Sequence, residues 1–143
     1  LARLYNLERE LDQALQEKIW LKSGGFLIIQ QTEAFVAIDV NTGKHSSKKD
    51  AEENYKQINR EAALEIARQL RLRNLSGMIL VDFINMKNTN DQSELLQYMG
   101  SLVRSDPMQT VVVDVTALGI MEITRKKSAK TLAEQLLQLK KGE

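Results

Sequence analysis

The sequence has no cysteine, one histidine and one proline among its 143 residues. The lack of cysteine excludes disulfides, thiol catalysis and cysteine-based zinc sites, and the single histidine, His45, excludes metal sites built from several histidines. No apolar run approaches the roughly 18 residues that a membrane-spanning helix needs, and no signal peptide is visible. We therefore expect a cytoplasmic protein that has no contact with a membrane.

The sequence also lacks an excess of charge of either sign, because its 20 Lys and Arg residues are nearly balanced by 19 Asp and Glu residues. A basic surface for nucleic acid must therefore be local. The hydrophobic content of 43% is ordinary for a globular protein, and the length suits one domain. Because the first residue is Leu rather than Met, we expect residues 1–143 to be a single domain cut from a longer chain.

Hydrophobic periodicity and turn residues predict a mixture of strands and helices. The predicted elements are strands over 18–22, 26–31 and 35–40, a helix over about 51–72, a strand over 78–83, a helix that Asp91 caps and that ends near 105–107, and strands over 110–116 and 119–125. Asp50 and Glu53 have the spacing of a capping box at the start of the first of these helices. This order predicts an α/β fold: a single mixed sheet, with an antiparallel β-meander and β-α-β crossovers, flanked by helices.

Both ends of the sequence carry a further amphipathic pattern. Residues 1–17 and 128–143 are predicted to form flanking amphipathic helices, each with an apolar stripe to bury. These helices could pack on the sheet, on each other or on a neighbouring chain. A homo-oligomer formed through them, or through segments of a longer parent chain, is therefore one alternative.

Two apolar strands each carry an aspartate near the carboxyl end, Asp39 and Asp82, and Asn41 shares a strand face with Asp39. If the two strands are parallel neighbours, these side chains meet at one edge of the sheet, where ligands of α/β sheets bind. Two carboxylates and an amide suit Mg²⁺, with Mn²⁺ as a plausible substitute. The alternative is that both aspartates cap backbone turns.

The loop after Asp39 is basic. Lys44 and Lys49 are candidate contacts to the backbone of a nucleic acid, although a lysine-rich loop is more often only solvated. Aromatic residues, 5% of the chain, are scarce for a protein that stacks bases, and we expect Phe26, Phe35 and Phe83 to lie in the core.

Several motifs, in order over about residues 19–127, resemble the ribonuclease E/G family. They are Ser23-Gly24-Gly25, Gln31–Ala34, Ala37–Gly43, Asn59–Ala63, Glu65–Gly77, Val81–Met86, Gly119–Glu122 and Thr124-Arg125. The resemblance implies the family's central catalytic subdomain, whose architecture is likened to DNase I. It further implies that Asp39 and Asp82 hold Mg²⁺ and that Asn41 positions the attacked phosphate or its water. Such enzymes cut single-stranded RNA internally and leave a 5′-phosphate and a 3′-hydroxyl.

Some positions depart from the family's pattern. Asn85 stands where an aspartate is frequent, and Ala117-Leu118-Gly119 replaces a frequent Arg-Phe-Gly. The family's S1-type RNA-binding domain, its 5′-monophosphate sensor and its zinc-binding cysteine pair are expected outside this segment. We therefore expect the chain by itself to be weakly active or inactive. The alternative to a catalytic core is a non-catalytic RNA-binding or assembly module.

Overall fold

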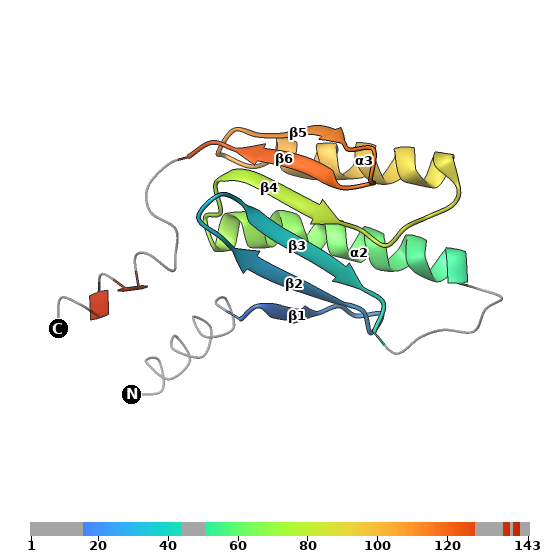
Figure 1. The fold of residues 1–143 in the computed structure, drawn as a ribbon, viewed down its shortest axis with the longest axis horizontal. Coiled ribbons are helices and arrows are strands. Elements are labelled where there is room, and N and C mark those ends of the chain that lie inside the picture. The colour runs from blue at the N-terminus through green and yellow to red at the C-terminus, as the bar shows by residue number, and fades with distance from the viewer. Residues whose placement is uncertain (1–15, 44–50, 128–135, 138, 141–143) are drawn as a thin grey trace.

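A computed structural model of the protein describes residues 16–43, 51–127, 136–137 and 139–140. The described residues form one open sheet of six strands, with two helices on one of its faces (Figure 1). In chain order the elements are β1 (Lys18–Trp20), β2 (Phe26–Gln31), β3 (Val36–Asn41), α2 (Ala51–Leu72), β4 (Gly77–Asp82), α3 (Thr89–Arg104), β5 (Thr110–Val115) and β6 (Met121–Arg125). The helix predicted over 51–72 is confirmed, and the strands agree with prediction to within two residues.

The sheet has the strand order β1-β2-β3-β4-β6-β5. Strands β1, β2 and β3 form an antiparallel meander, and helix α2 then crosses over to place β4 parallel to β3. Strand β6 lies between β4 and β5 and is antiparallel to both. The predicted α/β fold with a single mixed sheet is therefore confirmed.

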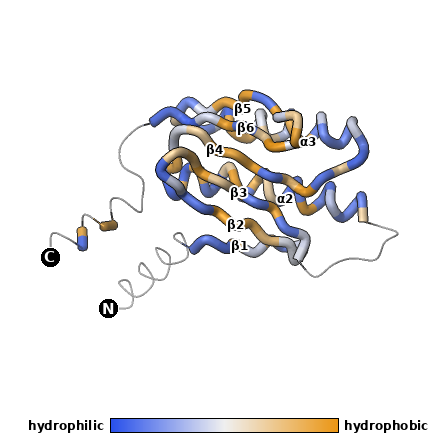
Figure 2. The backbone as a smooth tube through the Cα atoms, in the orientation of Figure 1, coloured by the Kyte–Doolittle hydropathy of each residue, from blue (hydrophilic) through white to orange (hydrophobic). Residues whose placement is uncertain are grey.

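The core lies between the sheet and the two helices. Along β3 the side chains of Val36, Ile38 and Val40 are buried against it, whereas Asp39 on the opposite face is exposed. Helix α2 covers this core with an apolar stripe that includes Ile66. Figure 2 shows hydrophobic stretches along the central strands. The polar positions of β3 and β4 are thus presented on a face of the sheet that neither α2 nor α3 covers.

The predicted first strand, over 18–22, ends early, at Trp20. A tight turn follows, in which the Leu21 N–H donates to the Gly25 carbonyl at 2.8 Å and the Gly24 N–H donates to the Leu21 carbonyl at 3.0 Å. Gly24 takes a φ of 97°, which a residue with a side chain rarely adopts. Phe26, the first residue of β2 after this turn, pairs with Asn41 at the end of β3.

The prediction that Asp91 caps the second helix is wrong. The N-cap is Asn88, whose side-chain oxygen accepts hydrogen bonds from the N–H groups of Asn90 at 2.8 Å and Asp91 at 3.3 Å. Asp91 instead lies in the first turn of the helix, where its negative charge complements the helix dipole. The predicted end of the helix is confirmed, because Ser105 is its C-cap.

Some predictions fall outside the described residues. These are the capping residue Asp50, the loop residues Lys44, His45 and Lys49, and most of the flanking helices over 1–17 and 128–143. Within the described ranges, no helix is both long enough and apolar enough to cross a membrane.

Candidate functional site

Two aspartates lie side by side at the carboxyl ends of β3 and β4. The two strands are parallel, and their register pairs Asp39 directly with Asp82. Both strand arrows in Figure 1 point to the same edge of the sheet. Adjacent strands lie about 4.8 Å apart, so the two carboxyl groups start from backbone positions that one cation can bridge. Both residues are exposed on the face that the helices leave open.

Asn41 belongs to the same group of side chains. It follows Asp39 by two residues on β3 and therefore points to the same face. Its side-chain amide donates a hydrogen bond to Oδ2 of Asp39 at 3.3 Å. The structure thus brings together all three residues that the sequence placed at this edge.

The electrostatics of the pair favour a cation. Partial burial and the nearby negative charge of Asp39 raise the pKa of the Asp82 carboxyl above its ordinary value. A divalent ion bound to both carboxylates would remove this repulsion. No group of three or more His, Asp or Glu side chains suited to a metal occurs among the described residues, so the available donors are two carboxylates and an amide. That set fits Mg²⁺, which commonly takes one or two carboxylates and keeps several waters.

A buried asparagine of α2 holds the segment that follows Asp82. The Nδ2 group of Asn59 donates to the Ile84 carbonyl at 2.8 Å, and the Ile84 N–H donates to Oδ1 of Asn59 at 2.9 Å. Asn59 is fully buried, so both bonds are shielded from water. The sequence carried a signal for this role, namely a polar side chain beside the apolar stripe of a helix.

A sequence profile of the Ribonuclease E/G family matches residues 1–128. The chain belongs to the ribonuclease E/G family. It is 41% identical to Ribonuclease G of Escherichia coli (strain K12) over 133 residues, which are 93% of this chain and 27% of that protein.

Two further relatives agree. Ribonuclease G of Haemophilus influenzae is 41% identical over 133 residues, which are 93% of this chain and 27% of that protein. Ribonuclease E of Nostoc sp. PCC 7120 is 40% identical over 130 residues, which are 91% of this chain and 19% of that protein. The chain therefore spans 27% or less of the length of these relatives.

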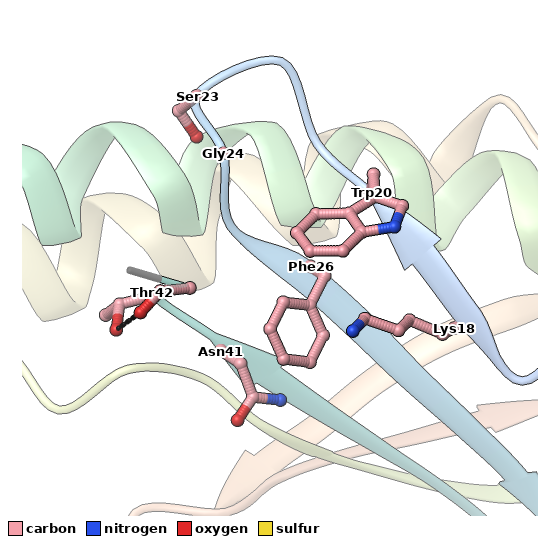
Figure 3. Close-up of a pocket in the computed structure, with 8 residues that line it drawn as sticks. Lys18, Trp20, Ser23, Gly24, Phe26, Asn41 and Thr42 are labelled. Atoms are coloured by element: carbon pink, nitrogen blue, oxygen red, sulfur yellow. Dashed lines mark hydrogen bonds between the residues drawn. The ribbon is translucent and has the colours of Figure 1, made fainter. Parts of the chain in front are cut away.

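In this member of the ribonuclease E/G family, a cavity of about 550 Å³ lies beside Asn41, the residue that bonds to Asp39. Asn41 lines it together with Lys18, Trp20 and Phe26 (Figure 3). The prediction that Phe26 lies in the core is wrong, because Phe26 is only half-buried and contributes to the wall of the cavity. The same prediction is wrong for Phe35, which is half-buried and not part of the core, whereas Phe83 is part of the core as predicted.

A carboxylate of α2 fixes the turn beside this cavity. Oε2 of Glu61 accepts hydrogen bonds from the Ser23 N–H at 3.1 Å and from Oγ of Ser23 at 2.5 Å. The turn between β1 and β2 is thereby fastened to the helix that also carries Asn59. Helix α2 thus holds both the turn beside the cavity and the segment after Asp82, through two residues, Glu61 and Asn59, that are two positions apart.

Proposed function

We propose that this chain is the catalytic core of a Mg²⁺-dependent endoribonuclease that cuts single-stranded RNA and leaves 5′-phosphate and 3′-hydroxyl ends. The observation that carries the proposal is the direct pairing of Asp39 with Asp82 on parallel strands. Membership of the ribonuclease E/G family supports RNA as the substrate.

In this proposal the carboxylates of Asp39 and Asp82 would hold the ion. When bound there, Mg²⁺ would supply positive charge against an RNA phosphate and would lower the pKa of a water. The two carboxylates also repel RNA when no cation is bound, because like charges approach there. Metal binding and RNA binding at this edge should therefore be coupled.

The remaining residues orient the RNA phosphate or the attacking water and hold the backbone near the aspartates. The amide of Asn41, now hydrogen-bonded to Asp39, can donate to a phosphate oxygen or to the attacking water. Asn59 is a positioning residue, because it fixes the backbone after Asp82 through Ile84. Lys44 and Lys49 stay predicted contacts to the RNA backbone.

The decisive experiment removes one negative charge at a time. Asp39→Asn and Asp82→Asn should each weaken Mn²⁺ binding to the chain, measured by electron paramagnetic resonance. In the full protein that carries this chain, each should slow cleavage of a labelled single-stranded RNA by about 100-fold or more, because metal sites tolerate little loss of ligand charge. The 3′-side product should be a substrate for a 5′-monophosphate-dependent exonuclease.

Glu33→Gln is the matched control, since Glu33 is an exposed carboxylate in the turn at the opposite end of β3. It should leave both metal binding and cleavage unchanged. If Asp39→Asn and Asp82→Asn fold normally and still cleave RNA at the original rate, the proposal fails. RNA binding without any metal-dependent cleavage would instead favour the non-catalytic binding module.

A further inference from the structure

An exposed tryptophan lies on the same face of the sheet as the aspartate pair, and nothing in the proposed cleavage uses it. Trp20 is 63% exposed on β1, although water contact with so large an apolar ring is unfavourable. Its ring centroid lies 5.2 Å from that of Phe26, and the two planes are inclined at 58°. Trp20 and Phe26 thus form an aromatic wall of the 550 Å³ cavity, open to solvent.

A lysine completes this wall. The ammonium of Lys18 lies 4.3 Å from the centroid of the Trp20 ring and 4.3 Å from that of Phe26. Figure 3 shows the three side chains together, with Asn41 next to Phe26. At an exposed site such cation–π contacts are weak, so a phosphate can draw the ammonium away at little cost. The cavity therefore offers both flat apolar surface and a movable positive charge.

The sheet register connects the aromatic wall to the aspartates. One row across the sheet runs from Trp20 through Phe26 to Asn41. The neighbouring row contains Lys18 and ends at Asp39 and Asp82. Residues paired in this way on adjacent strands point to the same face. Trp20 is two strands from Asn41, or about 10 Å. Asn41 itself belongs to both places, because it lines the cavity and bonds to Asp39.

We propose that this cavity is a nucleotide subsite, in which a base of the RNA stacks on Trp20 and Phe26 while Lys18 binds a backbone phosphate. The inference rests on the proposed function, since it names a second point at which the same RNA is held. Aromatic rings stack with every base, and a nearby cation neutralises the strand. The base bound there belongs to a nucleotide close to the bond that is cut.

The side chains that line the cavity argue against other classes of ligand. A cationic ligand, which aromatic cages otherwise attract, is disfavoured because the ammonium of Lys18 already covers both rings. A purely apolar ligand would cover the two rings but would offer no partner to the Lys18 ammonium. An aromatic group joined to an anion satisfies both parts of the wall, and a nucleotide is such a group.

Trp20 is the only tryptophan of the chain, so its fluorescence reports on this cavity alone. We expect saturable quenching when a single-stranded oligouridylate is added to the chain with Mg²⁺ and the signal is read before cleavage. Quenching should be weaker in EDTA, because the two carboxylates without a cation repel the strand. Free uridine should quench much less, because it offers no phosphate to Lys18. Failure of the oligonucleotide to quench up to millimolar concentration would overturn the proposal.

Variants test the stacking contact directly. Trp20→Ala should weaken binding of a labelled oligoribonucleotide, measured by fluorescence anisotropy, by about 5- to 140-fold. Trp20→Phe should restore most of the affinity, because a ring is present again. Leu64→Ala is the control, since Leu64 is also exposed, at 56%, but lies on α2. Equal affinities for Trp20→Ala and Leu64→Ala would contradict the subsite.

The salt dependence of binding tests the lysine. Lys18→Gln should lower the slope of log K against log salt concentration by about 0.7, the value for one phosphate contact on a single strand. Lys126→Gln should leave the slope unchanged. Lys126 follows Arg125, which pairs with Gly77 at the start of β4, whereas Asp82 is at the other end of that strand. An unchanged slope for Lys18→Gln would remove the phosphate from the proposal.

The subsite and the proposed function can fail separately. Asp39→Asn should stop cleavage yet leave the quenching of Trp20 intact. If metal binding and cleavage are confirmed while Trp20→Ala binds and cuts normally, the subsite is wrong and the nuclease proposal stands. If oligonucleotides quench Trp20 but the aspartates bind no metal, the cavity is an RNA-binding site on a protein that does not cleave.

Discussion

At the scale of single residues, one buried charged side chain with four hydrogen bonds lies away from the candidate site. Arg125 of β6 is only 4% exposed. Its Nε group donates to Oδ2 of Asp106 at 2.8 Å, and its Nη2 group donates to Oδ1 at 3.3 Å. Its Nη1 group donates to Oδ1 of Asn74 at 2.8 Å and to the Leu75 carbonyl at 3.0 Å. Arg125 therefore ties β6 to the segments that follow α2 and α3.

Removal of Arg125 should be costly. Arg125→Leu leaves the carboxylate of Asp106 buried without its partner, and we expect the free energy of unfolding to fall by about 3–5 kcal/mol. The control is Arg68→Leu, because Arg68 pairs with Glu65 at 2.9 Å on the exposed surface of α2. That exposed pair should contribute less than about 1 kcal/mol. Urea unfolding of both variants gives the comparison, and similar losses would contradict the structural role of Arg125.

The same ion pair sets a dependence on pH. Burial by itself raises the pKa of Asp106, but hydrogen bonds from Arg125, the Met108 N–H and Thr110, with the charge of Arg125, outweigh it and lower the pKa. A carboxyl whose pKa is lowered by folding stabilises the protein above the pKa of the unfolded chain, near 3.9. That contribution disappears as the pH falls through the folded value.

We therefore expect the native protein to lose stability steeply as the pH falls below about 4. Asp106→Asn should be less stable at neutral pH but should lose less on acidification, because it has no carboxyl to protonate. Urea midpoints measured from neutral pH downward test this. Parallel pH profiles for the two proteins would show that Asp106 is not the group responsible.

At the scale of elements, one glycine allows three of them to meet. A Cβ atom on Gly25 would lie 2.7 Å from the carbonyl oxygen of Asn41 and 2.9 Å from Cγ2 of Ile58. Gly25 directly precedes β2, Asn41 ends β3, and Ile58 belongs to α2. The close approach of these elements keeps Asn41 in place for both the aspartate pair and the cavity.

Gly25→Ala should push β3 away from the turn and cost about 1–3 kcal/mol of stability, as overpacked positions do. It should also weaken Mn²⁺ binding and oligonucleotide binding together, since both involve Asn41. Gly100→Ala is the matched control, because no atom lies within 4 Å of the added Cβ on α3. There the same change should stabilise the helix by about 0.5–1 kcal/mol. Equal effects in thermal unfolding would exclude the steric explanation.

The elements also show what the sequence could predict. Helix α2 was predictable because its apolar stripe repeats over 22 residues. The cap of α3 was not, because Asn88, Asn90 and Asp91 are all residues that favour helix starts. Only the geometry decides which side chain reaches the free N–H groups. Local chemistry therefore predicts that a helix starts in this segment without predicting at which residue.

At the scale of the whole molecule, the candidate site was predictable in part. Asp39 and Asp82 interrupt apolar strands, and the β-α-β order makes those strands parallel neighbours. The aromatic wall was missed because Phe26 opens a run that is apolar on both faces, so alternation does not tell which side chains face the helices. That choice is made by the register with β1 and β3, which brings Trp20 next to Phe26.

Within the part of the chain that the structure describes, no helix covers one face of the sheet, and β5 has no neighbouring strand on its outer side. Val111 and Val113 on β5 are 47% and 53% exposed, and such an edge strand can pair with another chain. An irregularity in the register between Val112 and Asp114, with the charge of Asp114, opposes such pairing. Self-association through this edge would use the apolar side chains that are exposed along β5.

Val113→Lys should reduce this self-association without unfolding the protein. The added charge lies on an exposed position of the edge, so the free energy of unfolding should change by less than about 0.5 kcal/mol. Val112→Lys is the contrasting variant, because Val112 packs against the core and the same change there should cost about 1–3 kcal/mol. Light scattering on heating and urea unfolding separate the two effects. If Val113→Lys scatters as strongly as the native chain while remaining folded, β5 is not the edge through which the molecules associate.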